Sequence, residues 1–240
     1  MKSINCELVL SPALFPYREL KECRTVVVDV LRATSSICAA LQAGAEEIVP
    51  LDSLEPLPIF REKGYTLAAE RNGKKVGDAE CGNSPTEYMK MDLHGKRLAY
   101  STTNGTVGLI RAAEESVETL AGCFGNISIL SRYMQETGGD WVIMCSGWKN
   151  GVSIEDTLFS GALIAELGQA CHIVNDAGNM ALSLYRHIGE ADLYNYCQRG
   201  THIQRLQKMG CFEDIRFVFE RDTCPVIPRL ENGVIRNYFL

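Results

Sequence analysis

The feature that most constrains the fold is a pattern that repeats along the chain: an apolar run, then a turn, then a segment with apolar residues at helical spacing. Residues 25–30, TVVVDV, form a nearly continuous apolar run, which is typical of a strand buried on both faces of a sheet. Residues 34–44, TSSICAALQAG, follow with apolar residues at helical spacing and a terminal glycine. Strands that alternate with helices predict an α/β fold, with a mostly parallel sheet covered by helices on both faces.

The same order recurs along the chain. It predicts further strands at 46–51, 66–70, 96–102, 117–122 and 140–147, and helices at 54–64, 106–115, 126–138 and 153–168. Residues 170–210 are expected to be mostly helical, and late strands, free to run antiparallel, are expected at 214–222 and 233–239. We therefore expect a three-layer α/β/α architecture in a single domain over residues 1–240, with the TGGD turn near 138–140 as a candidate division into two lobes.

The charge of the chain narrows the classes of ligand. The formal net charge is −6, and no run of Lys or Arg residues occurs, so the sequence predicts no nucleic-acid partner. An anionic ligand would need positive potential supplied locally by Arg, Lys, backbone N–H groups or a metal ion.

The hydrophobic runs and the cysteines indicate in which cellular compartment the protein is expected. No apolar run reaches transmembrane length, and residues 1–20 lack the apolar segment of a signal peptide, so no membrane association is expected. The 10 cysteines are scattered without a CxxC pair, which is typical of buried thiols in a reducing cytoplasm. A homodimer is the prior expectation, because two-fold assemblies are the commonest oligomers.

Polar residues gather after the predicted strands. In open α/β sheets, ligands bind beyond the carboxyl ends of the strands, so we expect these residues to share one edge of the sheet. They comprise Asp29 and Arg32, Glu70 and Arg71, Asn83 and Ser84, Thr102 to Gly105, Asn126, and Glu155 with Asp156.

The segment TTNGT, residues 102–106, lies between a predicted strand and a helix N-terminus. Such an N-terminus offers free N–H groups and a partial positive charge, which suit a phosphate. Thr102, Thr103 and Asn104 add donors, and Gly105 permits close approach of the backbone. The structural alternative is a helix cap with a turn glycine, which any α/β protein needs.

The acids at the strand ends also allow two interpretations. Asp29 could bind a metal or attack phosphorus while Arg32 clamps a phosphate, or the two could form a structural ion pair. Glu155 and Asp156 could hold a hard cation, but Ser153 and Asp156 also fit a capping box.

Several familiar signatures are absent from the sequence. It contains no P-loop, no G-x-G-x-x-G after the first strand, no G-x-S-x-G elbow and no Cys with an Arg six residues later. A D-x-D-x-T motif at Asp29 fails because Leu31 replaces the second acid. The histidines, at 94, 172, 187 and 202, form no metal-binding pattern and are interpreted as surface or core residues.

Five long segments occur in an order that resembles the 2-phosphosulfolactate phosphatase family. They are VVVDVLRATSSICAAL, ERNGKKVGDAECGNSPTEY, STTNGTVGLIRAA, AGCFGNISIL and CSGWKNGVSIEDTLFSGALI, and the segment GCFEDIRFVFERDTCPVIPRL is similar to the family's closing segment. The resemblance runs from about residue 6 to the C-terminus.

The resemblance implies a cytoplasmic, Mg²⁺-dependent acid phosphatase that acts on a small anionic phosphate ester. Its reaction would release sulfolactate and phosphate from 2-phosphosulfolactate, an early step toward coenzyme M. Catalytic roles would fall to Asp29, Arg32 and Glu70, and Mg²⁺ would be held by Asp29, Glu155 and Asp156. The substrate would be bound by Arg71, Asn83, Ser84, Thr102, Thr103, Asn104, Gly105 and Asn126. Whether Asp29 or a metal-bound water attacks phosphorus stays open.

Other functions are compatible with the same residues. A relaxed site could hydrolyse other small 2-phospho acids, such as phosphoglycolate or phospholactate. A non-catalytic anion-binding protein is a second alternative, although the acids at the predicted site would repel an anion. The third is an α/β scaffold in which these turns have only structural roles.

Overall fold

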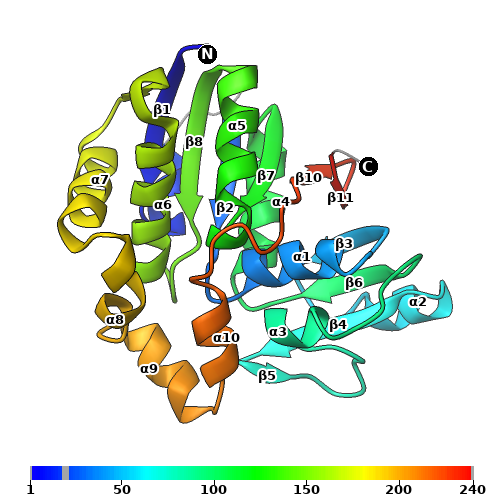
Figure 1. Cartoon of the computed structure of the whole chain (residues 1–240). Coiled ribbons are helices and arrows are strands. Elements are labelled where there is room, and N and C mark those ends of the chain that lie inside the picture. Colours follow the sequence, from blue (N-terminus) through cyan, green and yellow to red (C-terminus); the bar gives the residue numbers. More distant parts are fainter. Residues whose placement is uncertain (1, 18–21, 239–240) are drawn as a thin grey trace.

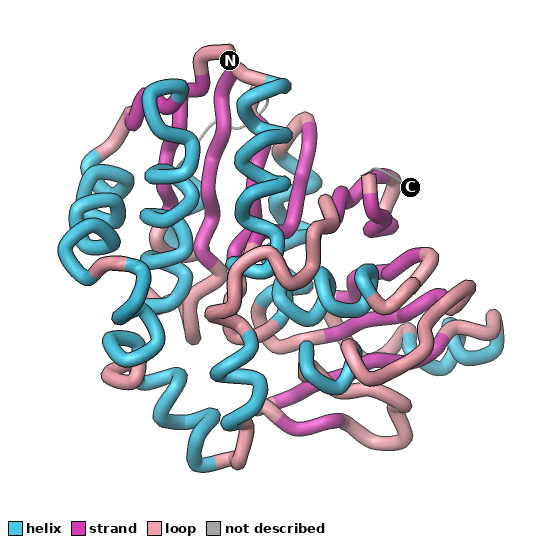
Figure 2. The backbone as a smooth tube through the Cα atoms, in the orientation of Figure 1, coloured by secondary structure: helices cyan, strands magenta, loops and turns pink. Residues whose placement is uncertain are grey.

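The predicted α/β architecture is confirmed by a computed structural model that describes residues 2–17 and 22–238. The strands form one 11-stranded mixed sheet in the order β5-β4-β6-β3-β11-β10-β7-β2-β8-β1-β9 (Figures 1 and 2). Their bounds are β1 Ile4–Val9, β2 Arg24–Val28, β3 Glu47–Leu51, β4 Thr66–Arg71, β5 Lys74–Lys75, β6 Arg97–Ser101, β7 Glu118–Gly122, β8 Gly139–Cys145, β9 Cys171–Ile173, β10 Pro228–Glu231 and β11 Val234–Asn237.

Helices connect most of these strands. The α-helices are α1 Ala33–Gln42, α2 Leu57–Glu62, α3 Pro85–Tyr88, α4 Gly105–Glu115, α5 Ile127–Thr137, α6 Ile154–Leu167, α7 Asp176–Ile188, α8 Leu193–Cys197, α9 Thr201–Lys208 and α10 Phe212–Phe217. Short 3₁₀ helices are η1 Pro12–Tyr17, η2 Phe124–Asn126, η3 Gly168–Ala170 and η4 Glu190–Asp192. In the described part of the chain, no helix combines the length and the apolar character that crossing a bilayer requires.

A C-terminal hairpin divides the sheet into two parallel groups. One group is β4, β6 and β3, and the other is β7, β2, β8, β1 and β9. The hairpin strands β10 and β11 are antiparallel to each other and to their outer neighbours β7 and β3, so the two groups run in opposite directions. In Figure 1 the first group lies across the direction of β1, β2 and β8.

Strand β2 is buried on both faces, as its continuous apolar run predicts. Val26 and Val28 pack in a core cluster with residues of α5 and α6, and Val27 packs in a second cluster with residues of α1 and α4. The alternation follows from the two-residue repeat of a strand. Helix α1 is itself buried from Ala33 through Leu41, so it forms the centre of the second cluster rather than a surface layer.

Two late segments had been expected to form strands. The expectation of a strand at 214–222 is wrong, because this segment forms the end of α10 and the turns that follow it. Ile215 and Val218 are its most buried side chains, and their spacing of three is helical rather than alternating. The strand at 233–239 is confirmed as β11 over 234–237, and residue 239 lies outside the described residues. The TGGD turn leads from α5 into β8, which lies between β1 and β2 in the sheet.

We expect the hairpin to depend on its buried face. Ile235 is 1% exposed and pairs with Ile48 of β3, whereas Val234 is only partly buried. Ile235→Ala should lower the free energy of unfolding by about 2–4 kcal/mol, because it removes buried methyl groups and leaves a cavity. Val234→Ala, the matched control, should cost less than about 1 kcal/mol. Urea titration of both variants checks this, and equal losses would contradict it.

Candidate active site

A narrow pocket lies where the ends of β2, β4 and β6 meet. Seven of the predicted site residues line it: Asp29, Arg32, Glu70, Asn83, Thr102, Thr103 and Asn104. The other lining residues are Leu31, Gly73, Trp148, His202, Arg205 and Leu206. The cavity volume is about 20 Å³, which is room for little more than one water molecule.

Asp29 lies at the meeting point of two helix N-termini. Ala33, the first residue of α1, donates its N–H to Oδ1 of Asp29 at 3.2 Å. Gly105, the first residue of α4, packs against the other oxygen so closely that a Cβ atom would lie 2.6 Å from Oδ2 and 2.3 Å from Cβ of Ala33. Both helices therefore direct the positive ends of their dipoles toward this pocket.

The turn that presents Asp29 is held by hydroxyl groups of α1. The Thr34 hydroxyl donates to the carbonyl oxygen of Asp29 at 2.9 Å, and the Ser35 hydroxyl donates to that of Val30 at 2.9 Å. Burial raises the pKa of Asp29 well above its ordinary value, the nearby carboxylates of Asp156, Glu70 and Glu155 raise it further, and the Ala33 N–H opposes them. The pocket thus carries a local excess of negative charge beside two positive helix ends.

Glu70 and Arg71 end β4 with their side chains in different surroundings. Glu70 lines the pocket and accepts hydrogen bonds from the backbone N–H of Gly73 and from the Thr103 hydroxyl. Arg71 donates to the Ser101 hydroxyl at 2.9 Å and to the carbonyl oxygen of Glu70, and it is not among the lining residues. The alternation of a strand separates the two side chains.

The TTNGT segment caps a helix and also lines the pocket. Thr102 and Thr106 form reciprocal bonds, each hydroxyl accepting the other residue's backbone N–H, at 3.2 and 3.1 Å. Thr102 thus stabilises the start of α4 as a cap does. Thr103 and Asn104 face the pocket, and the Asn104 side chain makes no capping bond although it occupies the N-cap position.

Arg32 is anchored at the pocket wall by an acid that the sequence analysis placed in a strand. Its Nη1 lies 2.6 Å from Oδ2 of Asp214 in α10, and both side chains are 6% exposed. Nη2 donates to the carbonyl oxygen of Gly73 at 3.2 Å. The other oxygen of Asp214 accepts from the hydroxyls of Ser84 and Thr86 at 2.7 and 2.6 Å. Ser84 therefore supports Arg32 from behind and does not line the pocket.

Two other predicted site residues use their side chains to bind backbone groups. Asn126 is fully buried; it accepts from the backbone N–H of Cys123 and donates to the carbonyl oxygens of Ala121 and Val226. Asp156 accepts one backbone N–H on each oxygen, from Val30 at 2.9 Å and from Gly147 at 3.0 Å, and burial raises its pKa to about 6. Neither residue lines the pocket.

Glu155, beside Asp156 at the start of α6, is 2% exposed, and its Oε2 has no hydrogen-bond partner among the described residues. Burial, with a smaller contribution from Asp156, raises its pKa to about 8. Glu155 is therefore mostly protonated at neutral pH, and it too lies outside the pocket lining.

The carboxylates that line the pocket fit a magnesium ion. Among the described residues, no three His, Cys, Asp or Glu side chains form a ready metal cage. Mg²⁺, however, keeps several waters and is commonly bound by one or two carboxylates together with substrate phosphate. Asp29 and Glu70 supply such a pair, and a divalent cation would offset the negative charge around Asp29. The oxygens of Asp156 are already used by backbone amides.

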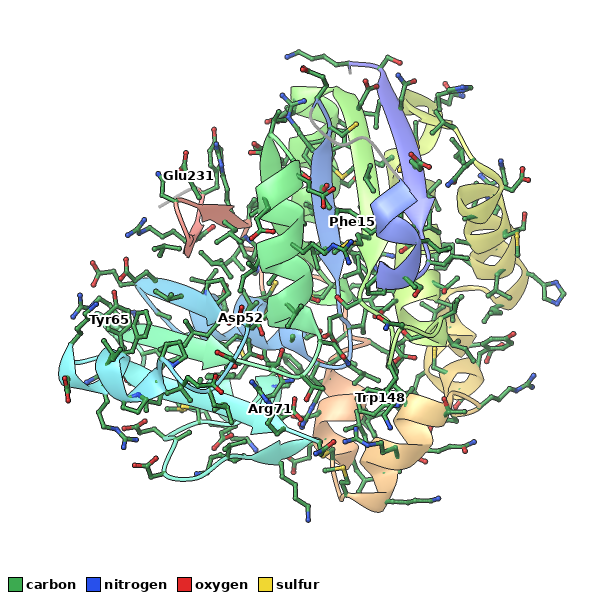
Figure 3. The ribbon with its side chains drawn as sticks, turned by 180° about the vertical axis from the view of Figure 1, so that it is seen from behind. Phe15, Asp52, Tyr65, Arg71, Trp148 and Glu231 are labelled. Atoms are coloured by element: carbon green, nitrogen blue, oxygen red, sulfur yellow. The ribbon has the colours of Figure 1, made fainter. Side chains whose placement is uncertain are left out.

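Helix α9 and a loop tryptophan form the remaining wall, which the sequence analysis did not identify. Trp148 is labelled in Figure 3. Its ring lies against His202, with ring centroids 4.8 Å apart, and under the guanidinium of Arg205 at 4.3 Å. Burial lowers the pKa of His202 to about 4, with a further contribution from Arg205, so the imidazole is neutral at pH 7. The only sequence signal was that Trp148 follows a predicted strand.

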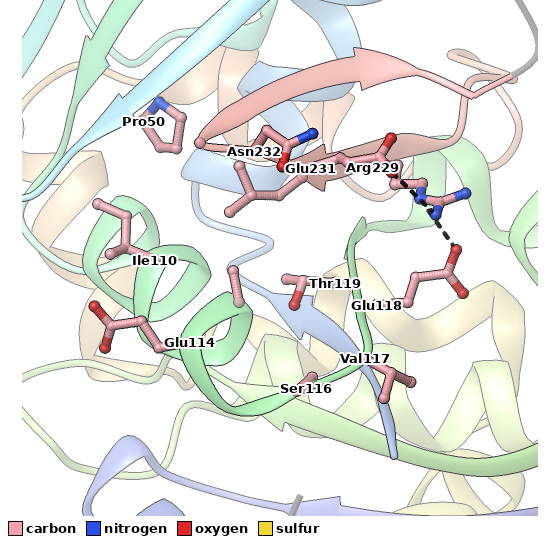
Figure 4. Close-up of a pocket in the computed structure, with 13 residues that line it drawn as sticks. Pro50, Ile110, Glu114, Ser116, Val117, Glu118, Thr119, Arg229, Glu231 and Asn232 are labelled. Atoms are coloured by element: carbon pink, nitrogen blue, oxygen red, sulfur yellow. Dashed lines mark ion pairs between the residues drawn. The ribbon is translucent and has the colours of Figure 1, made fainter. Parts of the chain in front are cut away.

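A larger hollow of about 520 Å³ lies elsewhere, between the C-terminal part of α4, the start of β7 and the hairpin (Figure 4). Glu114, Glu118 and Glu231 line it, and its cation Arg229 is paired with Glu118 at 3.3 Å. None of the predicted site residues lines this hollow. Its charge is unsuited to an anion, so the narrow pocket is the better candidate.

The sequence comparisons agree on one family. A family model described as 2-phosphosulpholactate phosphatase matches residues 9–233. Probable 2-phosphosulfolactate phosphatases from Caldanaerobacter subterraneus and Gloeothece citriformis are each 35% identical to this chain, over 91% and 95% of it and over 92% and 97% of their own lengths. One from Synechocystis is 36% identical over 91% of this chain and 93% of its own.

Because Gly105 packs so closely against its neighbours, we expect a side chain at this position to destabilise the protein. Gly105→Ala should lower the free energy of unfolding by about 1–3 kcal/mol, because its methyl group would overlap Ala33 and Asp29. Gly108→Ala in the same helix is the control: its Cβ would meet its nearest atom, the Ser146 hydroxyl, at 3.2 Å, so a small side-chain shift and better helix propensity should make its cost smaller than that of Gly105→Ala. Thermal and urea unfolding test this, and a stable Gly105→Ala protein would refute the close packing.

Glu155 predicts a change of stability with pH. Its pKa of about 8 in the fold exceeds the ordinary 4.5, so the folded state holds the proton more tightly, and stability falls as pH rises from about 4.5 toward 8. Glu155→Gln, which resembles the protonated acid, should come within about 1 kcal/mol of the wild type near pH 5 and exceed its free energy of unfolding near pH 8 by on the order of 3–4 kcal/mol.

Glu114→Gln, at an exposed position, serves as the control and should change stability little at either pH. Urea unfolding at both pH values gives the comparison. A Glu155→Gln effect of the same size at pH 5 and pH 8 would show that Glu155 does not titrate between them.

Proposed function

The chain belongs to the 2-phosphosulfolactate phosphatase family, and from this we propose that it is a Mg²⁺-dependent phosphoric monoester hydrolase acting on 2-phosphosulfolactate. The observation that carries the proposal is the convergence of two carboxylates, Asp29 and Glu70, with two helix N-termini and Arg32 at one pocket. Anions and a divalent cation can be bound side by side only where both kinds of group meet.

The phosphoryl group would lie against the starts of α1 and α4. The guanidinium of Arg32 would donate to its oxygens, and Thr103 and Asn104 would add side-chain donors. The Ala33 N–H is already bonded to Asp29, so α1 would act on the phosphoryl group through its dipole. Asp214 keeps Arg32 at the wall, so the cation is in place before the substrate arrives. Such preorganised groups stabilise charge without reorganising during the reaction.

Hydrolysis forms a bond from a water oxygen to phosphorus and breaks the bond from phosphorus to the C2 oxygen of the ester. The C2 oxygen leaves with a proton as the hydroxyl of sulfolactate, and inorganic phosphate is the second product. The uncatalysed reaction is among the slowest known, so positioning and charge stabilisation must supply most of the acceleration. Asp29 and Glu70 would hold Mg²⁺, which when bound neutralises charge on the phosphoryl oxygens.

Substrate choice decides the biological role. Selective hydrolysis of 2-phosphosulfolactate would support a step toward coenzyme M. Comparable hydrolysis of 2-phospholactate and phosphoglycolate would support the same chemistry in a less selective phosphatase. Phosphate release from these esters by the purified protein, with Mg²⁺ or with chelator, is the test.

Asp29→Asn gives the sharpest test of the site. The variant should fold, with a free energy of unfolding at least equal to that of the wild type, because it removes a carboxyl that is costly to ionise in its buried position. Its phosphate release with Mg²⁺ should fall by about a thousandfold or more, because a ligand or nucleophile is lost. Asp52→Asn, at an exposed position, is the matched control and should keep full activity. A folded Asp29→Asn protein with near-normal turnover would remove Asp29 from the mechanism.

A further inference from the structure

Arg205 is a cation of the pocket lining with no acidic partner. The other lining arginine, Arg32, is neutralised by Asp214 at 2.6 Å. Arg205 makes no ion pair and no hydrogen bond with any described residue, and its side chain is only partly buried. An unpaired guanidinium directed at an enclosed pocket is available for an anionic ligand.

Stacking on Trp148 orients the guanidinium plane of Arg205 and leaves its N–H groups unused. The guanidinium lies over the Trp148 ring at 4.3 Å, an interaction that uses its face and not its edge. Gly73 packs closely beside it: a Cβ atom there would lie 2.5 Å from Met209 and 3.2 Å from Nη2, so the glycine gives the guanidinium its room. The edge of the guanidinium therefore remains free to bind a carboxylate or sulfonate with two parallel hydrogen bonds.

His202, one turn before Arg205 on α9, provides an independent observation. It lines the same pocket, is 9% exposed, and its Nδ1 is buried without a hydrogen-bond partner among the described residues. Because the imidazole is neutral at pH 7 and is hydrogen-bonded to the backbone of Leu31, this Nδ1 is an acceptor, so it offers the α9 wall a position for a donor group of a ligand and not for an anion. His202 and Arg205 are three residues apart and thus lie on the same face of the helix.

We infer that Arg205 binds the second acid group of the substrate, the one that is not transferred, and thereby selects phosphate esters that carry such a group. The inference rests on the proposed function, because the phosphoryl group is taken to lie at Asp29 and the helix N-termini. The α9 wall is then left for the rest of the substrate. A carboxylate or sulfonate placed there without Arg205 would face the negative charge of Asp29 and Glu70 alone.

A matched pair of esters separates the two ends of the substrate. 2-Phospholactate and isopropyl phosphate differ only in that a methyl group replaces the carboxylate. Arg205→Met keeps a long side chain over Trp148 but removes the charge. It should lower kcat/KM for 2-phospholactate about 10- to 100-fold, mainly through KM, and change that for isopropyl phosphate less than about threefold.

Arg199→Met is the control for this experiment. Arg199 also stacks on an aromatic ring, that of Tyr196 at 5.0 Å, in the turn between α8 and α9, but it does not line the pocket. The control should leave both esters unaffected. Equal losses on the two esters in Arg205→Met would place Arg205 at the transferred phosphate and overturn the inference, as would no loss on either.

A binding measurement tests the inference without turnover. Because the cavity holds only about 20 Å³, a bound acid must displace side chains around Trp148, and its fluorescence should change. Titration with 3-sulfolactate should give a saturable change in the wild type and at least about a tenfold weaker Kd in Arg205→Met. This result would support the inference even if no ester were hydrolysed. Equal affinity of the two proteins, or no binding to the wild type, would overturn it.

Discussion

The buried ion pair between Arg32 and Asp214 joins the segments that form the site. Two charges this deep are tolerated only when the remaining donors and acceptors are satisfied as well. Here the chain supplies them from four places: the loop after β2, the turn at Gly73, the start of α3 and helix α10. Losing one partner would leave the other charge buried and would free α10 from the pocket wall. The pair therefore fixes the geometry of the wall and not only the position of one arginine.

The same region concentrates acids that repel one another. Asp29, Glu70, Glu155 and Asp156 interact across a short distance, and the fold tolerates them through protonation, through backbone N–H groups and through helix dipoles. Asp156 and Glu155 lie behind the pocket, and Asp29 and Glu70 line it. Glu155 and Asp156 are thus buried within the fold, whereas Asp29 and Glu70 can contact a ligand in the pocket.

Local sequence signals predicted much of this arrangement and failed where tertiary contacts decide. The apolar run of β2 and the helical periods predicted the α/β fold. The carboxyl ends of strands were the right places to look for Asp29, Glu70 and Thr102, but the expected single edge of one sheet is wrong, because β4 and β6 run opposite to β2 and lie across its direction (Figure 1). Arg71 and Asn126 also follow strands, but strand alternation and a backbone hydrogen-bond network direct them elsewhere. Asp214, His202 and Arg205 lie far along the chain on short helices, and no periodicity relates them to β2. Only the packing of α9 and α10 against the pocket brings them there.

The C-terminal hairpin has a consequence for when the site can exist. All residues that line the pocket lie before residue 207, yet β10 and β11, the strands that join the two oppositely directed groups of the sheet, come last in the chain. A polypeptide still emerging from the ribosome therefore contains every group of the site before it contains the seam between the two halves. Completion of the sheet that supports the pocket therefore depends on the last strands of the chain, which do not themselves line it.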